Sequence, residues 1–321
     1  EVLEEQRKGT SAYIRVKDHD TQQELGWTWK GNTENQERKY KNATATYHYH
    51  VGGNDLIVFL PEKGLPEGKE DVFMFFHGIG GDYSTDKTHA QTGRYEDNPA
   101  IAANMAQAVN KSGGIAICPQ AKTPGNASYE WAAIQQGGFQ AMVDMTLTRL
   151  NADLGRTDQP LTAGDISLAG HSAGGSALGQ AALDTGATDV TLQDAGYHYN
   201  AFKASWPKLR DWFLLGEAPK TIRVISQINN RGGTQYPVTG NRELTKRQIV
   251  SHSKVLAGAG QIPGPVTIEE IAGDGKVEEG GMILQEGYRV IRSDGKLQGS
   301  LRIYEMASKS VDHWGVASNT M

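Results

Sequence analysis

The chain has 321 residues, of which 38% are hydrophobic and 39 are glycine, and its net charge is −5. This length is enough for one large domain with a sizeable core or for two small ones. No apolar run approaches the roughly 20 residues of a membrane-spanning helix, and no cluster of Lys and Arg indicates nucleic-acid binding. We therefore expect a soluble protein with no transmembrane segment and no nucleic-acid partner.

The sequence carries no signal that fixes a cellular location. The chain starts at Glu1 instead of methionine, so we expect that an upstream segment has been removed, as happens in secretion. The sole cysteine, Cys118, lies in the apolar run 114–119. No internal disulfide can form, and we expect a buried structural thiol.

Alternation of polar and apolar residues marks the first 60 positions. Residues 1–10 are charged, and we expect them to be irregular. Stretches within 11–30 and 43–60, such as Tyr13-Ile14-Arg15-Val16, are typical of antiparallel edge strands. We therefore predict an N-terminal extension, 1–44, with edge strands, followed by a main domain over 45–321.

The pattern changes at residue 72, where a continuous apolar run, 72–76, indicates a strand covered on both faces. Further short apolar runs follow at 114–118, 165–169, 190–193 and 221–228. Helix-like segments lie between and after these runs, at 98–111, 129–151, 174–184 and 203–215. Strands that alternate with helices predict an α/β fold with a mostly parallel central sheet and helices on both faces.

The region 229–300 is read as an insertion and hairpin region of the main domain. Residues 229–280 show little hydrophobic periodicity, and we assign no element to them. Residues 282–291 and 297–306 flank Ser293-Asp294-Gly295-Lys296, a strong turn signal. These two segments therefore predict a β-hairpin.

The segment Gly170-His171-Ser172-Ala173-Gly174 matches the pattern G-x-S-x-G. An apolar run precedes it, and a stretch of small residues, 175–182, follows it. A nucleophile elbow needs this order of strand, sharp turn and helix, because its serine is strained and a Cβ at the flanking glycines would collide with the neighbouring strand and helix. The context favours Ser172 as an activated nucleophile over a plain glycine-rich turn.

A second glycine-rich segment, 77–81, directly follows the apolar strand 72–76. We predict that backbone N–H groups of Gly78 and Ile79, with that of Ala173, form an oxyanion hole. The rival interpretation is a dinucleotide-binding loop. It fails because Tyr83 stands where the third glycine of that fingerprint would fall.

With the loop at 77–81, the elbow at 170–174 and a late histidine in this order, the chain resembles the α/β-hydrolase fold family, especially its esterases and lipases. The resemblance covers roughly residues 45–321 and implies the order nucleophile, acid, histidine. Three histidines remain as the base after the elbow, namely His198, His252 and His313. Because His313 alone follows a credible final strand, 301–306, the resemblance implies that His313 is the general base.

The acid is where the sequence departs from the family pattern. Its usual place follows the strand 221–228, but residues 227–230 there read Gln-Ile-Asn-Asn and hold no carboxylate. Asp194 ends the preceding strand, where some family members carry the acid, and is our first choice. Asp274 is the second. Asp312 is set aside because side chains of adjacent residues rarely form the bond required with His313.

These residues predict acyl transfer from a small-molecule or polymer carboxylic ester to Ser172, with no cofactor. An amidase or peptidase with the same triad stays open. So does an inactive hydrolase fold that serves as a binding or effector domain, since the usual acid position lacks a carboxylate. Aromatic residues close in sequence to the site are expected to rim an open cleft: Tyr83, Tyr197, Tyr199 and Trp314.

Two histidine-containing clusters are candidates for a metal site. His and Asp suit zinc, and the chain has Asp18-His19-Asp20 together with His48 and His50. Strand alternation and a polar turn explain these residues without a metal. We therefore predict no metal site.

Overall fold

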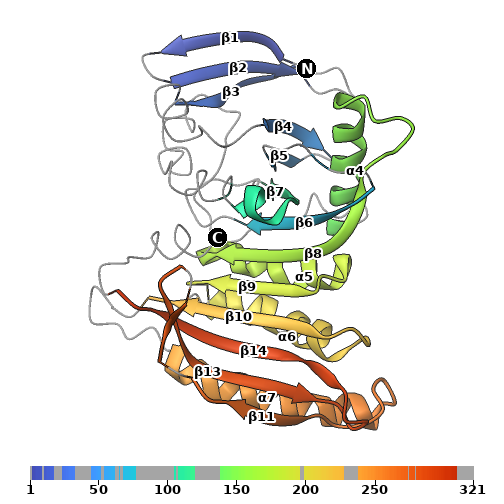
Figure 1. Cartoon of the computed structure of the whole chain (residues 1–321), viewed down its shortest axis with the longest axis vertical. Helices are drawn as coiled ribbons and strands as arrows, with labels where there is room; N and C mark the ends of the chain where they lie inside the picture. The colour runs from blue at the N-terminus through green and yellow to red at the C-terminus, as the bar shows by residue number, and fades with distance from the viewer. Residues whose placement is uncertain are drawn as a thin grey trace. The chain divides into compact units, whose positions relative to one another are not determined.

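The computed structural model of the protein consists of two compact units, residues 1–164 and 165–321 (Figure 1). The described residues are 2–8, 11–17, 24–32, 45–51, 54–61, 65, 68–76, 105, 108–119, 138–195, 199–227, 238–273, 275–278 and 280–308.

The first unit opens with a three-stranded antiparallel sheet in the order β1-β2-β3. Its strands are β1 (Val2–Lys8), β2 (Ser11–Lys17) and β3 (Glu24–Asn32). The edge strands expected within 11–30 are therefore present. The expectation of an irregular segment at 1–10 was wrong, because Val2–Lys8 pairs with β2 and so satisfies its backbone groups in a ladder.

Four further strands of this unit follow the order β4-β5-β7-β6. The hairpin β4 (Ala45–Val51) and β5 (Asn54–Leu60) is antiparallel, β5 is antiparallel to β7 (Ile115–Pro119), and β7 is parallel to β6 (Lys69–Phe76). Val72, Met74, Phe75 and Phe76 are buried, as the apolar run predicts. The helix α4 (Gly138–Asp153) buries Phe139. The ring of Phe139 packs edge-to-face against that of Phe76, with the ring centroids 5.3 Å apart.

Cys118 lies within β7 and is buried, which confirms the structural role expected for it. Burial raises the pKa of its thiol far above the ordinary value, because the thiolate would lose its hydration. The side chain therefore behaves as a small apolar residue of the core.

The second unit has the strand order β8-β9-β10-β14-β13-β11, with the short β12 (Val277–Glu278) paired to β13. The first four strands, β8 (Thr162–His171), β9 (Asp189–Gln193), β10 (Lys220–Ser226) and β14 (Leu297–Met306), are parallel. β13 (Met282–Ile291) is antiparallel to β14 and to β11 (Thr267–Ile271). Parallel strands with helical crossovers confirm the predicted α/β class.

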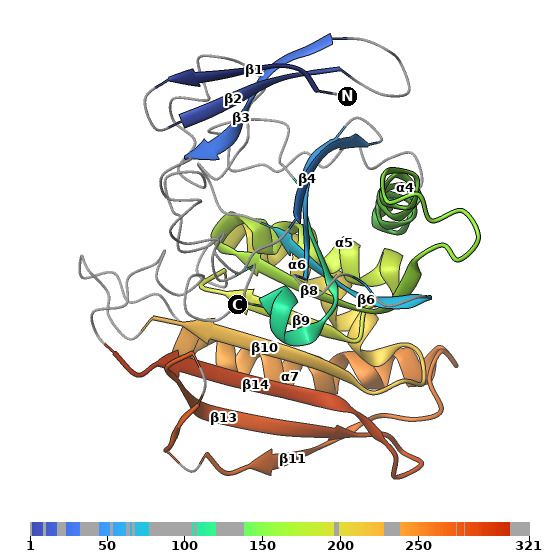
Figure 2. The same ribbon diagram turned by 45° about the horizontal axis from the view of Figure 1, so that its top comes forward.

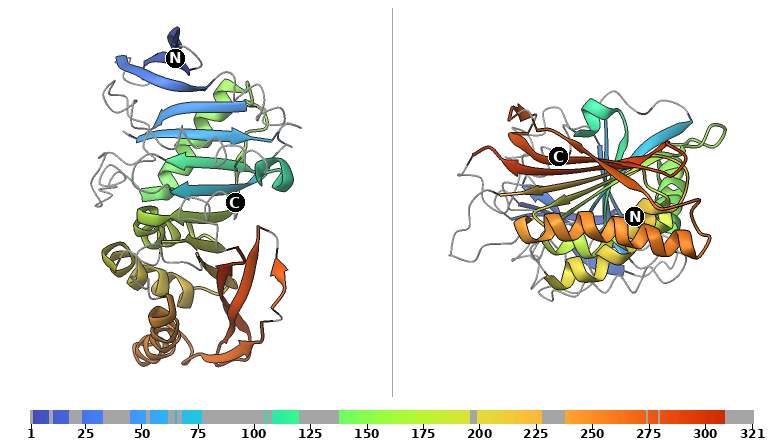
Figure 3. Two further views of the ribbon diagram at one scale, coloured as in Figure 1. Left: turned by 90° about the vertical axis from the view of Figure 1, so that its left-hand side faces the viewer. Right: turned by 90° about the horizontal axis from the view of Figure 1, so that it is seen from below.

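Three helices of this unit, α5 (Gly175–Thr185), α6 (Tyr199–Leu214) and α7 (Val238–Gly258), lie together on one face of its strands (Figures 2 and 3). α6 covers the predicted helical segment 203–215 up to Leu214 and buries four of its apolar residues, Trp206, Leu209, Trp212 and Phe213. α7 occupies a stretch to which the sequence assigned no element. The hairpin β13–β14 spans the predicted residues, and Gly295 in its turn has φ +80°.

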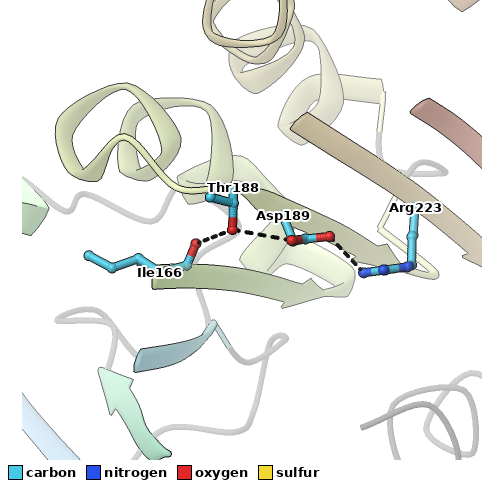
Figure 4. Close-up of polar contacts among 4 residues, drawn as sticks. All are labelled: Ile166, Thr188, Asp189 and Arg223. Atoms are coloured by element: carbon cyan, nitrogen blue, oxygen red, sulfur yellow. Dashed lines mark hydrogen bonds and ion pairs between the residues drawn. The ribbon is translucent and has the colours of Figure 1, made fainter. Parts of the chain in front are cut away.

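Polar side chains join the amino end of β9 to its two neighbours (Figure 4). The hydroxyl of Thr188 donates to the carbonyl of Ile166 at 3.5 Å and lies 3.2 Å from Asp189 Oδ2. Asp189 Oδ1 in turn lies 3.2 Å from Arg223 Nη1 on β10. These contacts fix the three strands at the end opposite to the one where the segment 172–174 follows β8.

Candidate active site

Ser172 lies at a sharp turn between β8 and α5. The last four residues of β8 are buried, the chain then makes a 3-10 turn over Ser172–Gly174, and α5 begins at Gly175. Ser172 has φ +53° and an exposed fraction of 4%. A left-handed conformation costs a residue with a Cβ about 1–2 kcal/mol, and such strain tends to gather at functional sites.

Glycines on both sides of Ser172 are favoured because other atoms lie very close to their Cα atoms. A Cβ on Gly170 would lie 3.0 Å from the backbone of Gly174, and one on Gly175 would lie 2.6 Å from Cβ of Ala195. Real Cβ atoms essentially never approach a heavy atom as closely as at Gly175, and a contact of 3.0 Å is tighter than nine in ten real ones. The turn at Ser172 therefore requires glycine at 175 and favours it at 170.

Small residues in α5 let it approach α6 closely. A Cβ on Gly179 would lie 2.3 Å from the carbonyl oxygen of Ser205, and the N–H of Gly179 donates to Ser205 Oγ at 2.6 Å. The side chains of Ala177, Leu178 and Ala181 are buried. This packing holds the start of α5, and with it the turn at Ser172, in one position.

Asp194 takes the position after β9 that Ser172 takes after β8. The last paired residues of these parallel strands are His171 and Gln193, so Ser172 and Asp194 are the next residue on each at the same end. Asp194 has φ +46° and an exposed fraction of 4%. Among the residues that the structure describes, Ser172 and Asp194 are the non-glycine residues with positive φ.

Two hydrogen bonds hold Asp194 to the adjacent strand. Its backbone N–H donates to the carbonyl of Ile225 at 2.7 Å, which extends the β9–β10 ladder. Its Oδ2 accepts from Nε2 of Gln227 at 3.1 Å. In the sequence, Gln227 marks only the lack of a carboxylate after β10, whereas in the structure its amide contacts the aspartate after β9.

Most of the other predicted site residues lie outside the described residues: Gly78, Ile79, Tyr83, Tyr197, Asp274, His313 and Trp314. Ala173 is described by its backbone alone, as the second residue of the 3-10 turn, and Tyr199 begins α6. The structure therefore brings together Ser172 and Asp194 from the predicted set.

His252, one of the three late histidines, is engaged between two helices. Its Nε2 forms a hydrogen bond with Asp211 Oδ1, which links α7 to α6. Trp206 and Gln248 form a second link between the same helices. The position of His252 in α7 fits a helix-packing contact.

His48 and His50 alternate with tyrosines on β4, opposite Ile57 and Asp55 of β5, and residues 18–20 lie outside the described ranges. No group of three or more His, Cys, Asp or Glu side chains within the described ranges is placed to hold a metal ion. Nor does any helix in those ranges have the length and apolar character needed to cross a bilayer.

The described elements combine the order β4-β5-β7-β6, a parallel series β8-β9-β10-β14 and a strained serine between β8 and a helix. This is the α/β-hydrolase fold. The sequence itself matches no protein-family model and no curated protein.

Solved structures with this fold resemble the chain at low identity. An acetyl xylan esterase from Aspergillus awamori is 14% identical, with 81% of this chain and 93% of that one covered and a TM-score of 0.42. An S-formylglutathione hydrolase from Staphylococcus aureus is 16% identical, with 65% and 85% covered and a TM-score of 0.39. A serine hydrolase homologue from Coxiella burnetii is 14% identical, with 64% and 83% covered and a TM-score of 0.35. Similarity at this level gives no evidence about the function of this chain.

Proposed function

We propose that the chain is a serine hydrolase that cleaves carboxylic esters by acyl transfer to Ser172. One observation carries the proposal: Ser172 and Asp194 are equivalent positions directly after two adjacent parallel strands, both buried and both with positive φ. A glycine would adopt either backbone conformation without strain, so packing alone does not require a serine at 172 or an aspartate at 194. Backbone strain at two residues of the predicted triad therefore points to a functional role. Ser172 in this strained turn is the nucleophile elbow of the proposed site.

In the proposed mechanism His313 accepts the proton of Ser172 Oγ as that oxygen attacks the ester carbonyl. The proton then passes to the leaving alcohol, and water repeats the sequence on the acyl-enzyme. Asp194 orients the imidazole and stabilises its charged form. The backbone N–H groups of Ala173 and Ile79, beside Gly78, stabilise the oxyanion. Tyr83, Tyr197 and Trp314 are proposed to contact the substrate, and the proposed steps need no cofactor.

The first test is labelling with a fluorophosphonate, because only an activated serine reacts with it. Wild-type protein should be labelled, and Ser172→Ala should abolish labelling and lower kcat on a simple activated ester by about 10⁴–10⁶-fold. An ester is the appropriate first substrate because an alkoxide leaves more easily than an amine.

Ser176→Ala is the matched control. Ser176 lies one turn further along in α5, and its Oγ has no hydrogen-bond partner among the residues that the structure describes. This variant should keep wild-type labelling and turnover. An unlabelled wild-type protein, or a Ser172→Ala variant with near wild-type turnover, would leave a binding or effector role for the fold.

A further inference from the structure

The amide of Gln227 lies against the carboxylate of Asp194, at the end of the strand next to it. Gln227 directly follows β10 and is half-buried, whereas Asp194 follows β9 and is buried. Gln227 Nε2 donates to Asp194 Oδ2 at 3.1 Å. A glutamine thus occupies the strand end that the family pattern reserves for the acid and contacts the carboxyl group on the neighbouring strand.

This hydrogen bond acts on the side chain of Asp194, because the backbone of Asp194 is already fixed. Its N–H donates to the carbonyl of Ile225 at 2.7 Å, so the strand pairing persists without Gln227. An ionised carboxylate only accepts hydrogen bonds, which makes the NH₂ group of the amide the end that faces it. The contact fixes the rotation of the carboxyl group by holding Oδ2, and it does not compete with a donor at Oδ1.

We propose that Gln227 is a positioning residue that orients the carboxylate of Asp194 toward the catalytic histidine. The inference rests on the proposed function, in which Asp194 is the acid of the triad. Gln227 does not touch substrate in this role, and its effect on turnover passes through Asp194. Such a residue should influence kcat much more than KM, because the histidine needs its orientation while the proton is transferred.

A double-mutant cycle with Asp194→Asn tests the proposal. Gln227→Leu removes the donor at similar volume and should lower kcat about 10-fold with KM unchanged. The same substitution in the Asp194→Asn variant should change kcat less than about 2-fold, since no carboxylate is left to orient. Equal losses in the two backgrounds, or no loss in the wild-type background, would overturn the proposal.

Two further variants separate positioning from folding. Gln227→Glu keeps the length of the side chain but replaces the donor by an acceptor, and should be at least as slow as Gln227→Leu. Gln298→Leu is the matched control. Gln298 Nε2 donates to the carbonyl of Phe213 at 2.8 Å. Gln298 lies at the amino end of β14, whereas Gln227 follows the carboxyl end of the parallel strand β10. It should lower the free energy of unfolding and leave kcat unchanged.

The turnover of Ser172→Ala and Asp194→Asn shows whether the role of Gln227 fails alone or the proposed function fails with it. If Ser172→Ala abolishes turnover but Asp194→Asn does not, the serine hydrolase stands and the role of Gln227 is refuted, because Asp194 is not the acid. If Ser172→Ala keeps turnover, the proposed function itself fails.

Discussion

Ser172 bears a backbone strain that its own side chain creates. At φ +53° a Cβ costs about 1–2 kcal/mol, whereas glycine adopts this conformation freely. Ser172→Gly and Ser172→Ala both lack the hydroxyl and should both be inactive. We expect the glycine variant to unfold with a free energy about 1 kcal/mol higher than the alanine variant, since the greater freedom of glycine in the unfolded chain offsets only part of the gain. Urea denaturation of both variants measures the difference, and a more stable alanine variant would show that the strain is absent.

The sequence predicts Ser172 and Asp194 for different reasons. Ser172 follows from a local pattern, because Gly170 is favoured where a Cβ would lie 3.0 Å from the backbone of Gly174 within the same turn. Asp194 follows from its position at the end of an apolar run. The contact between Gln227 and Asp194 joins residues 33 positions apart in the chain, and it depends on the order of strands, which no local pattern reveals.

Among the elements, the start of α5 and the turn after β9 share a very close contact near the site. Gly175→Ala would put a Cβ 2.6 Å from Cβ of Ala195, the residue after Asp194. We expect a loss of about 1–3 kcal/mol in the free energy of unfolding and a lower kcat, because Asp194 and Ser172 would move apart. Gly258→Ala, at the end of α7 with nothing within 4 Å of the new Cβ, is the control and should not destabilise the protein. Unchanged kcat in a folded Gly175→Ala variant would contradict the coupling of these two turns.

Lys220 connects the start of β10 to the end of α6. Its Nζ donates to the carbonyls of Trp212 and Leu215 and lies 5.3 Å from the centre of the Trp212 ring. Burial lowers the pKa of this ammonium group from 10.5 to about 8. The unfolded chain therefore binds more protons between these pH values, so Lys220 contributes a stability that rises as the pH increases from 8 to 10.5.

Measuring the free energy of unfolding of wild type and Lys220→Met across this pH range tests the assignment. The difference between them should change with pH in favour of the wild type toward pH 10.5. Two parallel curves would mean that the amine is not desolvated in the folded protein.

The helix α7 and the hairpin β13–β14 show why some elements could be predicted and others could not. The hairpin combines alternating strands with a glycine turn, and both signals are local. α7 buries Ile249, Ser253 and Leu256 on one stripe. The serine interrupts the apolar pattern, but its Oγ donates to the carbonyl of Val250 and accepts from the N–H of Val266. Tertiary contacts thus satisfy a polar residue that weakens the helical signal in the sequence.

For the molecule as a whole, the connection between β9 and β10 bears on substrate size. It runs over residues 194–219, and its described part is taken up by α6, whose apolar residues are buried in the second unit. No separate lid helix is present among the described residues of this connection. The open cleft predicted from the sequence would offer little apolar area to a long acyl chain, to which each buried CH₂ would contribute about 0.8 kcal/mol.

We therefore expect kcat/KM on p-nitrophenyl esters, from acetate to palmitate, to stay flat or to fall beyond short chains. The rate should not increase at the concentration where the substrate forms micelles. A steep rise toward palmitate together with such an increase would indicate that the region 229–300 closes over the site and that the enzyme is a lipase.

The burial of Cys118 makes the protein well suited to site-specific labelling. The chain has no other thiol, and this one is both inaccessible in β7 and kept protonated by its surroundings. A maleimide should therefore not react with the native chain, since thiolates are the species that react. A cysteine introduced at Lys296, whose side chain is 77% exposed in the hairpin turn, would accept a single fluorophore. The native sequence thus provides a background for spectroscopy in which no cysteine needs to be removed first.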